Sequence, residues 1–405
     1  MNSDSHPPFR PALSRALAAG AGLPEPDPDA RAHSEALSRR IQTEITAAGG
    51  CISFAHFMQL ALYAPGLGYY SAGLHKFGAA GDFVTAPELG TLFARCLALQ
   101  CLPLLQTLGE ADLLEVGAGS GALAADLLLA LETHGQLPRH YYILEVSADL
   151  RARQARRLRE RAPHLAARVQ WLETLPPQPL RGVVIANELL DALPVERFRI
   201  DAQGGVQKLC VAWQDGKFIW RAVGADADFA RRVLSRVATE TVPPGYTSEI
   251  HLQAEAWLRS LAGHLAAGAI LLIDYGYPRT EYYHAQRTDG TLLCHYRHRA
   301  HPDPLTLVGL QDITSHVEFT ALAEAGTEAG LTLLGYTSQA AFLLASGITQ
   351  MTQHDDAHAQ ILLAQEIKKL TLPQEMGEVF KVMAFGRDVE PGMSGFALQD
   401  RRGRL

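Results

Sequence analysis

A strand–turn–helix unit at residues 112–131 constrains the fold of this chain more than any other feature of the sequence. The apolar run at 113–116 is followed by the loop G-A-G-S-G at 117–121 and then by an apolar segment of helical length. Glycines take positive φ angles and let the backbone approach a ligand closely. N–H groups at the start of the following helix attract an anionic group. The pattern is typical of a nucleotide-type cofactor site, although a plain strand-to-helix turn also fits it.

Further short apolar segments follow this unit and are separated by helical segments. Continuous apolar strands that alternate with helices are typical of a parallel sheet buried on both faces. We therefore predict an α/β, Rossmann-like fold with a mostly parallel sheet. Its further strands are expected at residues 141–146, 169–173, 183–187, 269–275, 331–336 and 379–386.

The remaining segments define the domain organisation. Prolines crowd the first 30 residues, so residues 1–33 are predicted to form a disordered tail. Residues 34–110 are predicted to form a helical region in which Ser53 caps a helix and residues 63–88 form a cofactor and substrate loop. The domain itself is assigned to residues 111–388, with an antiparallel insertion at 197–245, a substrate-side loop at 279–318 and a C-terminal tail at 389–405.

Charge and cysteine content exclude several classes of protein. The net charge of −7 lacks the basic excess of a general nucleic-acid or membrane-surface binder. No apolar run reaches the ~18 residues of a membrane span, so no membrane insertion is expected. The five cysteines form no C-x-x-C pair, which argues against a disulfide scaffold or a zinc ribbon. Acids in the first 30 residues argue against a presequence, so we expect a cytoplasmic location.

The glycine loop alone leaves two cofactor classes open. Gly117, Gly119 and Ala122 satisfy a dinucleotide fingerprint, which keeps an NAD-dependent dehydrogenase as an alternative. Glu115 directly before the loop favours S-adenosylmethionine, whose ammonium group it can anchor through water. Glu145, at the end of the second strand, is suited to the two ribose hydroxyls, or else pairs with an arginine of residues 151–161. The predicted cofactor residues of this region are Glu115, Gly117, Gly119, Gly121 and Glu145.

Several ordered motifs carry a family resemblance. They are L-Y-A-P-G-L-G-Y-Y (62–70), G-D-F-V-T-A-P-E (81–88), L-E-V-G-A-G-S-G (114–121), A-N-E-L-L-D-A-L-P-V (186–195), D-I-T-S-H-V-E-F (312–319) and, more loosely, G-T-L-L-C-H-Y-R-H (290–298). With them the chain resembles the MidA / mitochondrial complex I assembly methyltransferase family over residues 35–388. His295 looks inserted, and Glu318 stands where the family pattern has Asp.

The resemblance implies a class I methyltransferase with a seven-stranded sheet that uses S-adenosylmethionine. It further implies methylation of a protein arginine linked to assembly of respiratory complex I, with a complex I subunit as a possible partner. The location is then the cytoplasm of a bacterium, or the mitochondrial matrix in a eukaryote. Two alternatives stay open: a small-molecule methyltransferase, and a non-catalytic assembly factor that binds S-adenosylmethionine.

An arginine acceptor places a chemical demand on the site. A guanidinium is protonated at ordinary pH, with a pKa above ~12, so carboxylates must hold it and accept a proton. Glu188 and Asp191 follow the fourth strand at the sheet edge where ligands bind in open α/β folds. Three residues apart, they would face the same way on one helical turn. Asn187 is predicted to shape the cleft and to contact the cofactor. The alternative is that Asp191 caps a local turn and Glu188 is solvated.

Two further segments supply candidate site residues. In the loop at 81–88, Asp82, Thr85, Pro87 and Glu88 are predicted to contact the cofactor, unless the loop is purely structural. His316 shares one face of an extended segment with Asp312 and Thr314, and is a candidate proton acceptor or substrate contact, or else a structural histidine. No metal is predicted, because the histidines at 284–301 lack a matching ligand pair and methyl transfer from a sulfonium needs none.

Overall fold

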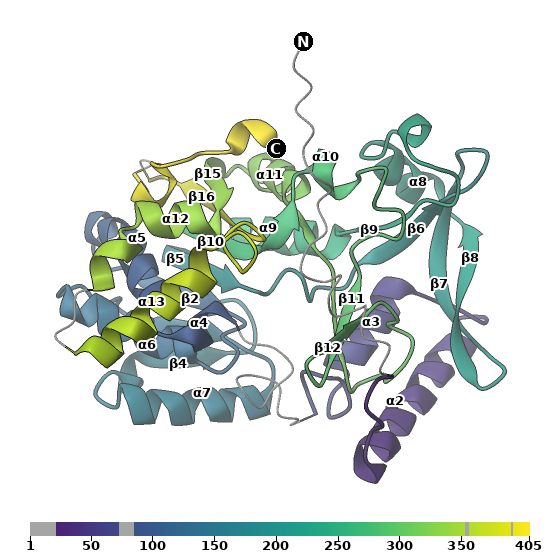
Figure 1. Cartoon of the computed structure of the whole chain (residues 1–405), viewed down its shortest axis with the longest axis horizontal. Coiled ribbons are helices and arrows are strands. Elements are labelled where there is room, and N and C mark those ends of the chain that lie inside the picture. The colour runs from purple at the N-terminus through teal and green to yellow at the C-terminus, as the bar shows by residue number, and fades with distance from the viewer. Residues whose placement is uncertain (1–21, 73–84, 353–355, 390–391) are drawn as a thin grey trace.

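The computed structural model describes residues 22–72, 85–352, 356–389 and 392–405. The chain forms two lobes that face each other (Figure 1). The larger lobe is a sheet covered by helices on both faces, and the smaller lobe combines the N-terminal helices with the insertion. No described helix combines the length and the apolar character that crossing a bilayer requires.

The central sheet has seven strands in the order β4-β3-β2-β5-β10-β16-β15, with β14 paired to the end of β10. The first five of these run parallel, and β16 is antiparallel to both of its neighbours. This order confirms the predicted Rossmann-like, mostly parallel sheet. The strands are β2 (Asp112–Val116), β3 (Tyr141–Leu144), β4 (Val169–Leu172), β5 (Leu180–Asn187), β10 (Leu265–Tyr277), β14 (Val317–Glu318), β15 (Thr332–Ser338) and β16 (Phe380–Arg387).

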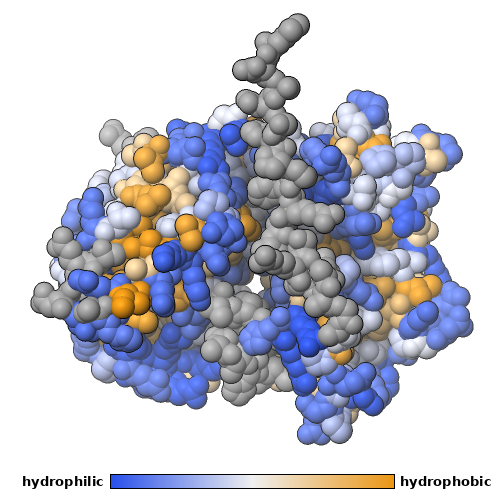
Figure 2. All heavy atoms as spheres, viewed as in Figure 1, coloured by the Kyte–Doolittle hydropathy of each residue, from blue (hydrophilic) through white to orange (hydrophobic). Residues whose placement is uncertain are grey.

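Both faces of the sheet are buried, which explains why its strands read as continuous apolar runs. In β5, Val183 and Ile185 pack on one face, whereas Val184 and Ala186 pack on the other. The first face is covered by α5 (Leu92–Leu108), α6 (Ala122–Thr133), α7 (Ala148–Arg161), α12 (Gln339–Ala345) and α13 (Ala357–Thr371). The second is covered by α9 (Leu252–His264) and α11 (Phe319–Glu328). Figure 2 shows apolar side chains gathered on the face that α12 and α13 form.

The smaller lobe packs two helices on an antiparallel sheet. The helix α2 (Pro28–Ala47) begins earlier than the predicted residue 34, because Asp27 caps it and Pro28 occupies its first turn, where proline is favoured. The next helix, α3 (Phe54–Tyr63), is capped by Ser53 as predicted. The insertion adds β6 (Glu196–Ile200), β7 (Val206–Gln214), β8 (Lys217–Gly224), α8 (Ala227–Leu234) and β9 (Thr247–Ile250), and β1 (Ile52–Ser53) pairs with β7.

A third, three-stranded sheet lies beside the cavity. Its order is β12-β11-β13, with β11 (Leu293–Tyr296), β12 (Arg299–His301) and β13 (Asp312–Thr314). Cys294 and Ile313 bury against α2 and α3 in the core of the smaller lobe. The chain then returns to the main sheet through β14, so this small sheet connects the two lobes.

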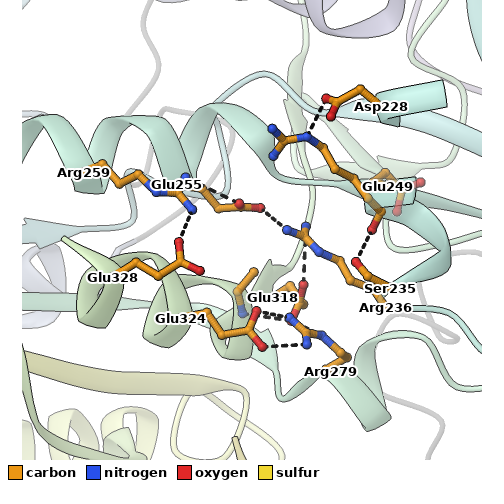
Figure 3. A network of polar contacts seen from close by, with 12 residues as sticks. Asp228, Ser235, Arg236, Glu249, Glu255, Arg259, Arg279, Glu318, Glu324 and Glu328 are labelled. Atoms are coloured by element: carbon orange, nitrogen blue, oxygen red, sulfur yellow. Dashed lines mark hydrogen bonds and ion pairs between the residues drawn. The ribbon is translucent and has the colours of Figure 1, made fainter. Parts of the chain in front are cut away.

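A buried network of ion pairs also joins the lobes (Figure 3). Arg236, just after α8, lies 2.8 Å from Glu255 of α9 and 3.8 Å from Glu318, which caps α11. Glu318 also pairs with Arg279 of α10 (Arg279–Tyr282) at 3.2 Å. The network therefore holds the insertion against the segment that carries His316.

The C-terminal segment predicted as a tail is partly packed against the larger lobe. Phe396 is buried and its ring lies 5.3 Å from that of Phe342 in α12. Residues 394–396 form a short 3-10 helix, and Phe396 joins the hydrophobic core on the α12 side of the sheet.

Candidate active site

A cavity of about 620 Å³ opens at the carboxyl ends of the parallel strands. It receives residues from both lobes and from the small sheet between them. It gathers most of the residues predicted from the sequence: Thr85, Pro87, Glu88, Glu115, Gly117, Gly119, Glu145, Asn187, Glu188, Asp191 and His316. Gly121 does not line the cavity, and Asp82 lies outside the described residues.

The glycine loop has the backbone conformation that its composition predicts. Gly117, Gly119 and Gly121 have φ angles of 70°, 51° and 82°. A Cβ at Gly117 would lie 2.9 Å from Leu189, and one at Gly121 would lie 3.0 Å from the Cα of Gln154. Gly117 and Gly119 therefore shape the cavity wall, whereas Gly121 permits close packing of α6 against α7.

Two buried carboxylates lie at the carboxyl ends of adjacent strands beside this loop, Glu115 within β2 and Glu145 directly after β3. Glu115 accepts a hydrogen bond from the Tyr141 hydroxyl at 2.6 Å, and burial raises its pKa to about 7. Glu145 accepts hydrogen bonds from the Ser147 N–H at 2.9 Å and the Gln154 side chain at 3.2 Å. These contacts fix both side chains at the cavity wall before any ligand arrives.

Glu88 makes an ion pair that holds a loop in place. It belongs to α4 (Ala86–Leu89), and its carboxylate accepts hydrogen bonds from Arg157 of α7 at 3.0 and 3.1 Å and from the Ser120 hydroxyl. The contacts attach α4, with Thr85 and Pro87, to the glycine loop. In this structure the Glu88 carboxylate therefore binds Arg157 and Ser120 at the edge of the cavity.

The segment after β5 is a turn, which corrects the helical turn predicted for Glu188 and Asp191. Glu188 has a φ of 50°, and its N–H donates to the Ile273 carbonyl at 2.9 Å. The buried carboxylate of Asp274 accepts from the N–H groups of Leu190 and Asp191 at 2.8 and 3.3 Å. These hydrogen bonds to β10 replace those that a helix would need. We call residues 187–192 the acceptor turn.

Both predicted carboxylates nevertheless face the same cavity. Glu188 accepts from the Ala86 N–H at 3.3 Å and the Asn187 amide at 3.2 Å, and Asp191 accepts from the Tyr275 hydroxyl. Loss of water contact, and secondly the charge of Asp191, raise the pKa of Glu188 to about 8. Burial raises the pKa of Asp191 to about 6. Within the described part of the chain, the second oxygen of Asp191 and the Asn187 carbonyl are buried without a hydrogen-bond partner.

His316 lies between two aromatic rings. Its ring stacks on Tyr277 at 5.2 Å and meets Tyr275 edge-on at 5.0 Å. Burial lowers its pKa to about 3, so the imidazole is neutral near pH 7 and is a weak base. This environment disfavours the predicted role as proton acceptor and leaves that of a substrate contact.

Several residues of the cavity were not assigned individual site roles from the sequence, although Tyr63 and Tyr70 belong to the loop predicted at residues 63–88 and Asp312 to the segment of His316. Tyr63, Tyr70, Tyr275 and Asp312 line it, and Asp274 supports the acceptor turn from behind. Tyr63, Tyr70 and Asp312 stand inside the motifs that carry the family resemblance, which was the available signal. The role of Asp274 depends on its hydrogen bonds to the acceptor turn, more than 80 residues earlier in the chain, so no local sequence pattern predicts it.

The wall groups fit S-adenosylmethionine, a ligand with an apolar ring, a ribose and two cationic centres. Val146 exposes 67% of its surface beside Glu145 and offers apolar contact to a ring. Among the described lining residues six are acidic and none is Lys or Arg. Such a wall suits a cationic ligand and repels the pyrophosphate of a dinucleotide. No group of three or more candidate metal ligands occurs in the described ranges.

The strand order and the cavity define a class I methyltransferase. In agreement, residues 96–337 match the protein family described as "Putative S-adenosyl-L-methionine-dependent methyltransferase". A crystal structure from Burkholderia thailandensis bound to S-adenosyl-homocysteine has 47% sequence identity and a TM-score of 0.91, with 95% of this chain and 100% of that chain covered.

Curated relatives agree over nearly the whole length. The chain is 28% identical to protein arginine methyltransferase NDUFAF7, mitochondrial, of Danio rerio, covering 86% of both proteins. It is 29% identical to the Drosophila melanogaster homolog, covering 89% of this chain and 87% of the relative. The chain belongs to this family of S-adenosylmethionine-dependent methyltransferases. The predicted family, enzyme class and cofactor are confirmed, which sets the dehydrogenase alternative aside.

Proposed function

We propose that this enzyme transfers a methyl group to the guanidinium of an arginine in a protein. The observation that carries the proposal is the acceptor turn, where Glu188 and Asp191 face a cavity whose described lining contains no Lys or Arg. Buried carboxylates without a cation are unfavourable, so this arrangement favours a cationic ligand. The printed names of the Danio rerio and Drosophila melanogaster relatives, both protein arginine methyltransferases, support it.

The cofactor end and the acceptor end have separate tasks. We assign Glu145 to the ribose hydroxyls, and Glu115 to the methionine ammonium through water, with Gly117, Gly119 and α4 completing the wall. When bound, S-adenosylmethionine supplies a methyl group already activated by its sulfonium. The protein therefore has only to orient the acceptor nitrogen and exclude water.

At the acceptor end, carboxylates have to bind a cation and take up a proton. Glu188 and Asp191 orient the planar guanidinium, because carboxylates match its forked N–H donors. The acceptor nitrogen loses one proton as its bond to the methyl carbon forms. With a pKa of about 6, Asp191 is ionised near neutral pH and can accept this proton. Glu188, with a pKa of about 8, can do so once the cationic acceptor has displaced the proton that it carries in the free site.

Amide variants test this assignment directly. Glu188→Gln and Asp191→Asn keep side-chain size but remove the charge, so each should lower labelled methyl transfer into protein by about 100-fold or more. Glu240→Gln, an exposed residue of the insertion, is the matched control and should behave as wild type. S-adenosylhomocysteine should still raise the melting temperature of all three variants. Full activity in both amide variants would contradict the assignment.

The identity of the acceptor is a finer proposal. On the family resemblance, we propose that it is a subunit of respiratory complex I, in a bacterial cytoplasm or a mitochondrial matrix. Methyl label in an affinity-purified complex I, lost when this enzyme is deleted, is the expected result. Label confined to low-mass compounds would instead favour the small-molecule alternative.

A further inference from the structure

We propose that Asp312 is a third carboxylate that binds the acceptor guanidinium and that Tyr70 positions it; this inference rests on the function proposed above. Asp312 begins β13, is 3% exposed and lines the same cavity as Glu188 and Asp191. It comes from the small sheet between the lobes, whereas the other two carboxylates come from the acceptor turn. The guanidinium would therefore be held from two opposite elements.

Tyr70 fixes the orientation of Asp312. The Tyr70 hydroxyl donates a hydrogen bond to Oδ1 of Asp312 at 2.9 Å. The Tyr70 ring in turn stacks on Tyr63 with centroids 5.5 Å apart and an interplanar angle of 23°. The Tyr63 hydroxyl donates to the Ala192 carbonyl of the acceptor turn at 3.0 Å. The two tyrosines thus link Asp312 to the acceptor turn through one rigid unit.

The chemistry of the acceptor explains a third carboxylate. A guanidinium carries five N–H donors in one plane, and a carboxylate binds at most two of them in a forked arrangement. Glu188 and Asp191 already accept hydrogen bonds from the protein. Asp312, on a different side of the cavity, can accept from the guanidinium N–H donors that Glu188 and Asp191 do not bind. The charge of Asp312 also raises the pKa of Glu188, as expected if both carboxylates act on one site.

Kinetics on an arginine peptide test the inference. Asp312→Asn should raise KM for the peptide by about tenfold, the usual scale of one charge-assisted contact, while affinity for S-adenosylhomocysteine changes less than about twofold. Tyr70→Phe should raise KM by a smaller factor, and the double variant should be no worse than Asp312→Asn, because Tyr70 acts through Asp312. Tyr336→Phe, whose buried hydroxyl has no partner in the described structure and lies outside the cavity, is the matched control.

A pH profile separates acceptor binding from a merely structural role. Removing the Asp312 charge lowers the pKa of Glu188, so the acidic limb of kcat/KM should move to lower pH in Asp312→Asn and stay in place in the control. The inference would be overturned if Asp312→Asn still bound S-adenosylhomocysteine but changed neither KM for the peptide nor the acidic limb of kcat/KM. If Asp312→Asn fails to fold, an unchanged KM in Tyr70→Phe would do so. A wild-type enzyme that labels protein but never arginine would overturn the proposed function itself, and this inference with it.

Discussion

Glu188 and Asp191 illustrate what the site demands of single residues. Burial raises the pKa of both carboxyl groups, and the nearby charge of Asp191 raises that of Glu188 further. A structural protein would avoid this arrangement, since it weakens the folded state. Strongly shifted titrating groups that face a cavity are instead typical of functional sites.

These shifts predict how stability depends on pH. The pKa values rise from 4.5 and 3.8 in the unfolded chain to about 8 and about 6 in the folded one. As the pH rises from about 4 to 8, the unfolded state therefore loses protons first, and the free energy of unfolding falls. We expect a fall on the order of 1 kcal/mol or more between pH 5 and 8, because one pKa unit corresponds to ~1.4 kcal/mol. Urea unfolding of the wild type and Glu188→Gln checks it, since the variant should show a smaller fall. Equal slopes would contradict the assigned shift.

At the scale of elements, the glycine loop and the acceptor turn differ in how far the sequence predicts them. The loop between β2 and α6 is local: its glycines, the preceding apolar strand and the following helix all stand within residues 112–133. The acceptor turn is not local, because Asp274 of β10 fixes its backbone. The spacing of Glu188 and Asp191 correctly predicted that both side chains face the same site. The predicted helical turn was wrong, because no local sequence pattern encodes the hydrogen bonds to Asp274.

A pair of glycine variants tests the loop. Gly119 and Gly135 both have positive φ, 51° and 68°, but only Gly119 lines the cavity. Alanine at either position should destabilise the fold by about 1 kcal/mol through backbone strain. Only Gly119→Ala should also weaken S-adenosylhomocysteine binding, by about tenfold or more, in isothermal titration calorimetry. Equal affinities in the two variants would place the cofactor elsewhere.

At the scale of the whole molecule, two lobes build one cavity. The mostly parallel, α/β architecture was predictable from alternating apolar strands and helices, because that pattern has few stable topologies. The approach of the insertion and the N-terminal helices to the acceptor side was not, because it depends on long-range contacts such as Tyr63 with Ala192 and Arg236 with Glu255. The hydrogen bond between Tyr70 and Asp312 was not predictable for the same reason, since the two residues are far apart in the sequence.

The ion network between the lobes predicts that substitutions at two nearby arginines differ greatly in how far they lower the free energy of unfolding. Arg236→Gln leaves Glu255 and Glu318 buried with a partner removed and should cost about 3–5 kcal/mol. Arg231→Gln breaks an exposed pair with Asp228 in α8 and should cost less than about 1 kcal/mol. Chemical denaturation of both variants gives the comparison. Similar losses would mean that the network does not hold the lobes together.

The central claim is that this enzyme methylates arginine in protein, and amino-acid analysis of the product tests it most directly. The purified enzyme is incubated with labelled S-adenosylmethionine and a cell lysate, and the labelled protein is hydrolysed to amino acids. We predict that the label appears in methylated arginine with the wild type and with Glu240→Gln, and disappears with Glu188→Gln. Label in another amino acid, or only in small molecules, would contradict the account.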